Sequence, residues 1–345
     1  MLNNFQIEEI KEELNKSQNP LFYFDNDQDG FCSFLLLRRF IGRGIGIPVK
    51  TSPLDMNYFR RIDEFNPDYV VILDQPRVSS DFFESLRERN IPILWIDHHE
   101  KDFNFPDYIK YYNPLYSDSP ENVPVTKICY QINSKKEDLW IYIAGCIADK
   151  YLPPENKIFF QEYPDLGLNS ESAFNIFYNS EIGKISRMMG IGLKDKTSSV
   201  NKMIHFFIGV KTPYEVLEEN LKTRSLHKRF LEVDNKFKNL IAKAKLNVIG
   251  SSNLIFFKYS GNISMSADLA NRLSYDYPEK IIAVCYLNQG KVNFSIRGKK
   301  IKTKLIEIMK DFPFSSAGGH EDAIGGQISS DQIVDFKNKL EDNFK

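Results

Sequence analysis

An apolar stretch at residues 91–96, Ile-Pro-Ile-Leu-Trp-Ile, leads directly into Asp97, His98 and His99. Such a stretch is typical of a central strand that is buried on both faces of a parallel sheet. In α/β proteins the carboxyl ends of the strands open into the crevice where ligands bind. We therefore expect Asp97 and His98 at that crevice, where carboxylate oxygens and imidazole nitrogens can bind a divalent metal ion.

Two further apolar stretches, residues 21–24 and 69–73, also end in acidic residues. The carboxylates that follow them are Asp25, Asp27, Asp29 and Asp74. If the three strands are parallel, five acids and two histidines converge at one edge of the sheet. So many negative charges share a crevice only when positive charge lies among them, and a pair of Mg²⁺ or Mn²⁺ ions is the usual source. Alone, the acidic turn after residue 24 is equally typical of a polar loop or a calcium site.

Helical patterns alternate with these strands, which predicts an α/β fold with a parallel sheet and helices on both faces. We expect helices at 5–16, 31–41, 57–65, 82–89 and 125–132, and a short strand at 47–49. A continuously apolar helix over residues 140–149 ends at Asp149. This carboxylate is either an ordinary surface group or a further member of the acidic cluster.

Length, charge and cysteine content limit the class of protein. A chain of 345 residues predicts two domains. The formal net charge of −1 gives no global attraction to nucleic acid or membranes, so a polyanion would need a local basic patch. The four cysteines are widely spaced and form no CxxC pair, and no apolar run is long enough to span a membrane. We expect a soluble cytoplasmic protein with reduced thiols.

The second half of the chain changes character twice. Residues 155–245 have mainly helical patterns, and the charged amphipathic segment 216–244 suits a connector between domains. From residue 246 we expect a smaller α/β domain, with strands at 253–259, 280–287 and 291–297 and helices at 266–275 and 303–310. The predicted division is therefore a first domain over 1–210, a helical linker over 211–245 and a second domain over 246–345.

Two features of the second domain indicate a phosphate site. Gly318 and Gly319 allow a backbone to approach a ligand closely, and exposed amides could hold a phosphate beside His320. Five cations lie nearby, at Arg297, Lys299, Lys300, Lys302 and Lys304. The alternative is a solvated basic turn, and the adjacent Gly-Gly-His sequence favours the phosphate site.

Taken together, these motifs resemble those of the DHH phosphoesterases, specifically the RecJ-like branch with a C-terminal DHHA1 domain. The four motifs of the catalytic domain resemble, in order, Asp25–Gly30, Asp74, Asp97-His98-His99 and Gly145–Asp149. The sequence Gly318-Gly319-His320 resembles the DHHA1 signature, and Arg297 stands where that domain usually has a phosphate-binding arginine. The resemblance spans about residues 20–330.

The resemblance implies two divalent ions, Mn²⁺ by preference and Mg²⁺ as the alternative, bridged by Asp74. It implies that one ion is further bound by Asp25 and Asp27, and the other by Asp29, His98 and Asp149. The implied catalytic residues are Asp97, His98 and His99. The implied substrate-binding residues are His99, Arg297, Gly318, Gly319 and His320. One departure from the family pattern is Gln75-Pro76, which follows Asp74 where a glycine is common.

The resemblance supports three hypotheses about function. The first is a RecJ-like exonuclease that hydrolyses single-stranded DNA or RNA from an end, with water activated by two metal ions. The second is a phosphodiesterase for short oligonucleotides, cyclic dinucleotides or phosphoadenosine phosphate. The third is an inactive scaffold in a replication or repair assembly, which is disfavoured because every ligand position holds a competent side chain. Replication or repair proteins are expected as partners, and the Gly-Gly-His sequence argues against a type II pyrophosphatase.

Overall fold

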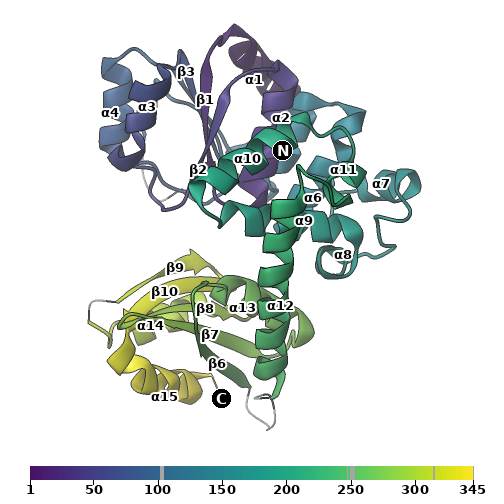
Figure 1. Cartoon of the computed structure of the whole chain (residues 1–345). Coiled ribbons are helices and arrows are strands. Elements are labelled where there is room, and N and C mark those ends of the chain that lie inside the picture. The colour runs from purple at the N-terminus through teal and green to yellow at the C-terminus, as the bar shows by residue number, and fades with distance from the viewer. Residues whose placement is uncertain (102–104, 247, 249–252, 314, 345) are drawn as a thin grey trace. The chain divides into compact units, whose positions relative to one another are not determined.

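The computed structural model describes residues 1–101, 105–246, 248, 253–313 and 315–344 (Figure 1). The chain divides into two compact units, Met1–Phe230 and Leu231–Lys345. Helix α12 (Arg224–Leu246) contains the boundary between them. Among the described residues, no helix combines the length and apolar character that a membrane span requires.

The first unit is built on a five-stranded sheet whose strands are all parallel. In spatial order they are β2 (Ile45–Val49), β1 (Pro20–Asp25), β3 (Tyr69–Leu73), β4 (Ile93–Ile96) and β5 (Lys110–Tyr112). This confirms the predicted parallel sheet, because the three strands that end in acidic residues lie side by side at its centre. Strand β5 is an addition that the sequence interpretation missed.

Helices cover both faces of this sheet, because its strands are apolar on both sides. Figure 1 shows α3 (Arg60–Phe65) and α4 (Ser80–Glu88) on one side and α2 (Gln28–Ile41) on the other. The other helices of the unit are α1 (Asn4–Lys16), η1 (Met56–Tyr58), η2 (Pro114–Tyr116), α5 (Val125–Asn133), η3 (Lys136–Asp138), α6 (Leu139–Ala148), α7 (Asn156–Glu162), α8 (Ala173–Asn179), α9 (Glu181–Leu193), α10 (Thr197–Gly209) and α11 (Pro213–Leu217).

Alternate residues of each strand enter two different cores. On β1, Phe22 and Phe24 pack into the core shared with α2, α5, α6 and α9. Leu21 and Tyr23 of the same strand pack into the smaller core under α3 and α4. Burial on both faces fixes the register of the strands, since a slip of one residue would exchange the two sets of side chains. The carboxyl ends of the strands are therefore held in fixed positions.

The second unit contains a smaller mixed sheet with the order β6 (Leu254–Ser260), β7 (Ile281–Asn288), β8 (Lys291–Arg297), β10 (Ala323–Ser329) and β9 (Ser316–His320). Strands β6 and β7 are parallel, and the other pairs are antiparallel. Its helices are α13 (Ser266–Asp276), α14 (Lys302–Met309), η4 (Ser330–Gln332) and α15 (Ile333–Asn343). A second α/β domain was predicted here, although α15 and the β9–β10 hairpin were not.

The predicted connector helix over residues 216–244 is interrupted in the structure. Residues 218–223 separate α11 from α12 because polar side chains bind the backbone there. The Thr223 hydroxyl donates to the carbonyl of Glu218 at 2.6 Å, and the Asn220 side chain accepts from the amide of Lys222 at 2.9 Å. Local bonds of this kind compete with helical hydrogen bonds, so they end one helix and start the next.

Candidate metal centre

Asp25 and Asp27 lie in the tight connection between β1 and α2. Asp25 ends the strand, and Asp27 is the N-cap of the helix, where its carboxylate accepts the amide of Gly30 at 3.0 Å. A Cβ at Gly30 would lie 2.5 Å from the carbonyl oxygen of Asp25. Only glycine allows this close approach of helix and strand, which keeps the two carboxylates together at the sheet edge.

Asp29 lies in the first turn of α2 and is almost fully buried. Its two carboxylate oxygens accept the amides of Val125 and Thr126, each at 2.8 Å. These amides begin helix α5, whose N-cap residue Pro124 has no side-chain acceptor. Asp29 therefore caps a second helix, which fixes its orientation toward the cluster.

Asp74 follows β3 and is buried at the centre of the cluster. Its backbone has a φ of +57°, a left-handed conformation that is uncommon for residues other than glycine, asparagine and aspartate. Its Oδ1 has no hydrogen-bond donor within the described residues. A buried oxygen of this kind requires a partner.

Asp97 and His99 form a hydrogen-bonded pair just beyond β4. The Nδ1 atom of His99 lies 2.8 Å from Oδ1 of Asp97, and the amide of His99 donates to Oδ2 at 3.3 Å. The hydroxyl of Tyr111 on β5 donates to the same Oδ2 at 3.4 Å. Asp97 thus orients the His99 ring.

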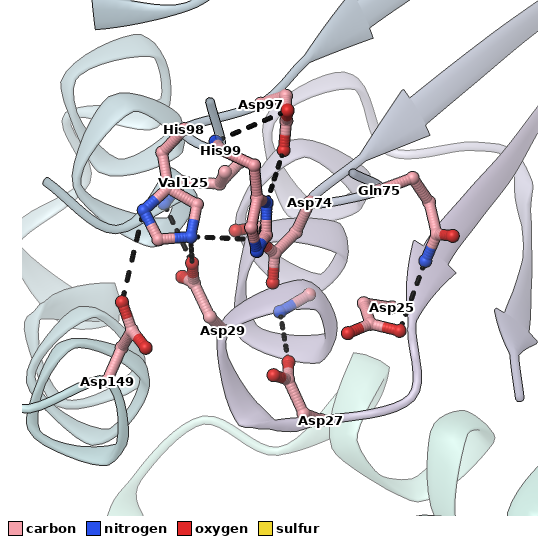
Figure 2. Close-up of polar contacts among 12 residues, drawn as sticks. Asp25, Asp27, Asp29, Asp74, Gln75, Asp97, His98, His99, Val125 and Asp149 are labelled. Atoms are coloured by element: carbon pink, nitrogen blue, oxygen red, sulfur yellow. Dashed lines mark hydrogen bonds and ion pairs between the residues drawn. The ribbon is translucent and has the colours of Figure 1, made fainter. Parts of the chain in front are cut away.

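His98 lies between three carboxylates (Figure 2). Its Nε2 is 3.3 Å from Oδ1 of Asp74 and 4.0 Å from Oδ2 of Asp29. Its Nδ1 is 3.9 Å from Oδ2 of Asp149, which follows α6. Asp149 keeps 44% of its side chain exposed, so the cluster opens to solvent on that side.

The electrostatics of the cluster are unfavourable to so many ionised acids. Burial, and then the charge of Asp27, raises the pKa of Asp25 to about 7. Partial desolvation by the surrounding cluster, and then the charge of Asp29, raises the pKa of Asp149 to about 7, although part of its side chain remains exposed. The same two causes, burial first and Asp29 second, raise the pKa of Asp74 well above its usual range. Positive charge placed among these groups would relieve the repulsion.

The donor atoms fall into groups with spacings suited to cations. Three sets of residues each offer ligand atoms within 4.8 Å of one another: Asp25, Asp27 and Asp74; Asp74, His98 and His99; and Asp29, His98 and Asp149. Carboxylate oxygens and imidazole nitrogens suit Mn²⁺, and carboxylate oxygens suit Mg²⁺. Oδ1 of Asp74 accepts no hydrogen bond from the described residues and lies 3.3 Å from Nε2 of His98, so this donor set fits divalent metal ions.

Gln75 also belongs to the site. In the sequence it was noted only as a departure from the family pattern, in which a glycine is common after this aspartate. It is fully buried, and its Nε2 donates to Oδ1 of Asp25 at 3.2 Å. The indole Nε1 of Trp95 donates to the Gln75 carbonyl at 3.1 Å, which holds the loop after Asp74. The only signal in the sequence was its position directly after Asp74, since the contact depends on the pairing of β1 with β3.

The expected substrate-binding residues of the second unit lie on one sheet. Arg297 and His320 are both paired with Ala323, so they lie in the same row across β8, β10 and β9. The Arg297 Nε donates to Oδ1 of Asn271 on α13 at 2.7 Å. The side chain of His320 lies outside the described part of the structure.

The glycine-rich stretch forms strands β9 and β10, and the predicted phosphate site beside His320 stays a prediction. Gly318 pairs with Gly325 in the β9–β10 hairpin, and Gly319 has a φ of +142°. A Cβ at Gly319 would lie 2.3 Å from the carbonyl oxygen of Ala323, and one at Gly326 would lie 2.4 Å from the Phe294 ring. Close backbone and ring contacts therefore require glycine at these two positions. By contrast, a Cβ at Gly318 would meet open space.

Comparisons with known families agree with this architecture. Residues 21–149 match the model of the DHH family N-terminal domain, and residues 251–345 match that of the DHHA1 domain. The chain belongs to the DHH family of phosphoesterases. Its two family domains occur in the predicted order. A comparison with curated protein sequences gave no match.

Solved structures similar to this DHH protein include two of RecJ. RecJ from Thermus thermophilus in complex with Mn²⁺ has a TM-score of 0.71 and 15% identity, covering 99% of this chain and 55% of that chain. The chain thus spans about half the length of that relative. Exonuclease RecJ bound to manganese has a TM-score of 0.67 and 14% identity, covering 99% of this chain and 94% of the other. At these low sequence identities, the TM-scores show a common fold.

A shorter relative is named for a different activity. The structure of PggH, a pGpG-specific phosphodiesterase from Vibrio cholerae, has a TM-score of 0.54 and 14% identity. The match covers 95% of this chain and 99% of that chain. The DHH fold of this chain is therefore shared by proteins described as an exonuclease and as a dinucleotide phosphodiesterase.

Proposed function

We propose that this DHH protein is a metal-dependent exonuclease that hydrolyses single-stranded DNA or RNA from an end. The observation that carries the proposal is the arrangement of donors around Asp74. One cation-sized group contains Asp25, Asp27 and Asp74, and another contains Asp29, His98 and Asp149. The two groups meet where Nε2 of His98 lies 3.3 Å from Oδ1 of Asp74. A bridging carboxylate between two adjacent cation sites suits phosphodiester hydrolysis.

Two ions, Mn²⁺ by preference and Mg²⁺ as the alternative, would be held by six residues. Asp74 would contact both, with Asp25 and Asp27 on one side and Asp29, His98 and Asp149 on the other. When bound, such ions lower the pKa of water and neutralise negative charge on phosphate oxygens. The amides of Val125 and Thr126 would hold the Asp29 carboxylate in a fixed orientation toward its metal ion.

His99 would contact the phosphate directly. Asp97 accepts the proton on Nδ1 of His99, which leaves the Nε2 proton for a substrate oxygen. Burial alone would lower the pKa of His99, but the hydrogen bond and charge of Asp97 outweigh it, and the pKa is raised to about 9. A protonated His99 would stabilise the negative charge that develops on the phosphate.

The DHHA1 domain would contribute to substrate binding. Arg297 offers a guanidinium group for a phosphate, in the sheet row that also contains His320. The open space above Gly318 would let a ligand approach the sheet backbone. We further propose residues 1–210 as the catalytic domain, 211–245 as a linker and 246–345 as the substrate-binding domain.

A second candidate function is hydrolysis of short substrates such as dinucleotides. The observation that favours it is the match to PggH over almost the whole length of both chains. The RecJ relative from Thermus thermophilus, by contrast, is about half uncovered by this chain. Association with replication or repair proteins is compatible with either function.

The test is a digestion assay with Mn²⁺. Single-stranded DNA and RNA, each labelled separately at either end, are incubated with the protein alongside a linear dinucleotide and a cyclic dinucleotide. Stepwise shortening of the long strands is the expected result, and the label released first gives the polarity. Cleavage of the dinucleotides alone would favour the second function, and cleavage of no substrate would contradict both.

A further inference from the structure

A pocket of about 280 Å³ lies within the first unit, at the carboxyl end of β2. It is bounded by three segments: the end of β2 with Lys50 and Thr51, the η1–α3 region, and the first turns of α10. None of its residues belongs to the DHH motifs or to the DHHA1 domain. It is therefore separate from the sites described above.

The charged residues that line the pocket are all basic. Its lining includes Lys50, Arg60 and Arg61, and none of the described residues that line it is acidic. Arg61 forms an ion pair with Glu64 on the same helix. Within the described residues, the side chains of Lys50 and Arg60 have no ion-pair partner, and both residues are exposed. In a protein with a net charge of −1, two cations without ion-pair partners among the described residues, Lys50 and Arg60, favour an anionic ligand in this pocket.

Neutral groups of the pocket add hydrogen-bond donors. The Tyr58 hydroxyl accepts the amide of Lys50 at 2.7 Å, so its own proton is available to a ligand. Helix α10 begins at Thr197 in the pocket wall, and its N-cap residue Lys196 provides no side-chain acceptor. The amides at the start of this helix add to the positive potential of Lys50 and Arg60.

The sheet places this pocket next to the candidate metal centre. Val49 of β2 is paired with Asp25 of β1, and Lys50 follows Val49 directly. Neighbouring strands are about 4.8 Å apart, so the start of the pocket and the Asp25 carboxylate occupy adjacent strand ends on one edge. A substrate with a phosphate at the metal centre could therefore place its next phosphate in the pocket.

We propose that this pocket binds a second phosphate group of the substrate, adjacent to the one that reacts. The proposal rests on the proposed function and narrows it, because it selects substrates with at least two phosphates. Lys and Arg contacts to phosphate do not distinguish bases. The pocket thus favours a polynucleotide over a simple phosphodiester, regardless of sequence.

The experiment compares two substrates with Mn²⁺ present. Pentathymidylate carries several phosphates, whereas bis(p-nitrophenyl) phosphate carries one. The double variant Lys50→Ala, Arg60→Gln is expected to raise the KM for pentathymidylate about tenfold relative to the KM for the one-phosphate ester. The control is Arg87→Gln, an exposed arginine on α4 outside the pocket, which leaves the ratio of the two KM values unchanged.

An unchanged KM ratio in the double variant would overturn the proposal, as would an equal change in the Arg87→Gln control. Inorganic phosphate is added in a separate arm. If it alters hydrolysis of the one-phosphate ester by the wild type but not by the double variant, and the KM ratio stays constant, the pocket takes free phosphate and the substrate assignment is wrong.

Failure of the proposed function gives a different pattern, in which the wild type cleaves neither substrate. The pocket is then tested by the fluorescence anisotropy of labelled pentathymidylate. Binding that is about tenfold weaker in the double variant than in the wild type and the control supports the pocket. Equal binding by all three proteins contradicts it.

Discussion

The carboxylate of Asp29 accepts the backbone amide of Val125, 96 residues further along the chain, at 2.8 Å. Its other oxygen accepts the amide of Thr126, so Asp29 provides the cap that helix α5 lacks. The same side chain lies 4.0 Å from His98 in the candidate metal centre. One residue therefore joins the packing of two helices to the geometry of the site.

This double role predicts that Asp29→Ala destabilises the metal-free protein. Loss of the cap leaves two buried amides without an acceptor, and we expect the free energy of unfolding to fall by about 2 kcal/mol. The comparison is Asp149→Ala, which removes a charge from the same cluster without removing a helix cap. Urea denaturation with EDTA at pH 8 measures both variants. Equal losses of stability in the two variants would show that Asp29 is not a structural cap.

The pair of Asp97 and His99 predicts an unusual titration. Burial lowers the pKa of His99, but the hydrogen bond and charge of Asp97 raise it by a larger amount, and the resulting pKa is about 9. In Asp97→Asn, we expect the His99 titration in the metal-free protein to move down by at least about one pH unit. The His99 ring signals in NMR spectra recorded from pH 5 to 10 provide the measurement.

The raised pKa of His99 makes the stability of the folded protein depend on pH. The pKa of His99 in the folded state lies above the unfolded value of 6.5. The stabilisation is thus fully present below about pH 6.5 and is lost as the pH rises through about 9. A wild-type His99 that titrates near 6.5, or one that is unaffected by Asp97→Asn, would contradict the assigned hydrogen bond.

The arrangement of the first unit could be predicted because one rule governs it. Apolar strands that end at Asp25, Asp74 and Asp97 meet at one edge when the strands are parallel, and the structure confirms the parallel sheet. The ligand roles of the individual residues stay predictions. The Asp29 cap could not be foreseen, because it depends on how α5 packs against α2.

The second unit was less predictable because its glycines are poor indicators of strands. Gly319 and Gly326 occur in the β9–β10 hairpin, although glycine is depleted in strands. Their role becomes visible only in three dimensions, where added Cβ atoms would meet the Ala323 carbonyl and the Phe294 ring. The contact of Gln75 with Asp25 is likewise a product of strand pairing.

Gln75 is predicted to position Asp25 for metal binding. Its amide donates to Asp25 Oδ1 at 3.2 Å, so Gln75→Glu would place a second carboxylate against an already crowded acid. We expect Mn²⁺ affinity at pH 7 to fall at least about tenfold, as is typical when a group that orients a metal ligand is replaced. Isothermal titration calorimetry and Mn²⁺ electron paramagnetic resonance provide the measurement.

The control for charge alone is Gln161→Glu on the exposed face of α7, which adds the same negative charge without contacting Asp25. Gln75→Asn keeps the amide on a shorter side chain, and it tests whether the amide group alone preserves part of the Mn²⁺ affinity. Retention of wild-type Mn²⁺ affinity in Gln75→Glu would contradict the positioning role.

Asp74 lies buried at the centre of the acidic cluster. The pKa values of Asp25 and Asp149 are raised to about 7 in the folded protein, and burial and neighbouring acids also raise the pKa of Asp74 well above its usual range. The folded state therefore binds more protons than the unfolded state. Without metal, stability is highest at acidic pH, falls as the pH rises from about 4 through about 7, and is recovered when Mn²⁺ is added.

Asp74→Asn separates this electrostatic cost from the function of the residue. Asparagine tolerates the left-handed backbone at φ +57°, and it removes a buried charge. Urea denaturation with EDTA measures the free energy of unfolding at pH 5 and at pH 8. We expect this free energy to fall less between the two pH values in Asp74→Asn than in the wild type. With Mn²⁺, hydrolysis by the same variant is expected to fall by at least about two orders of magnitude. A well-folded Asp74→Asn protein with near-normal hydrolysis would rule out Asp74 as the bridging ligand.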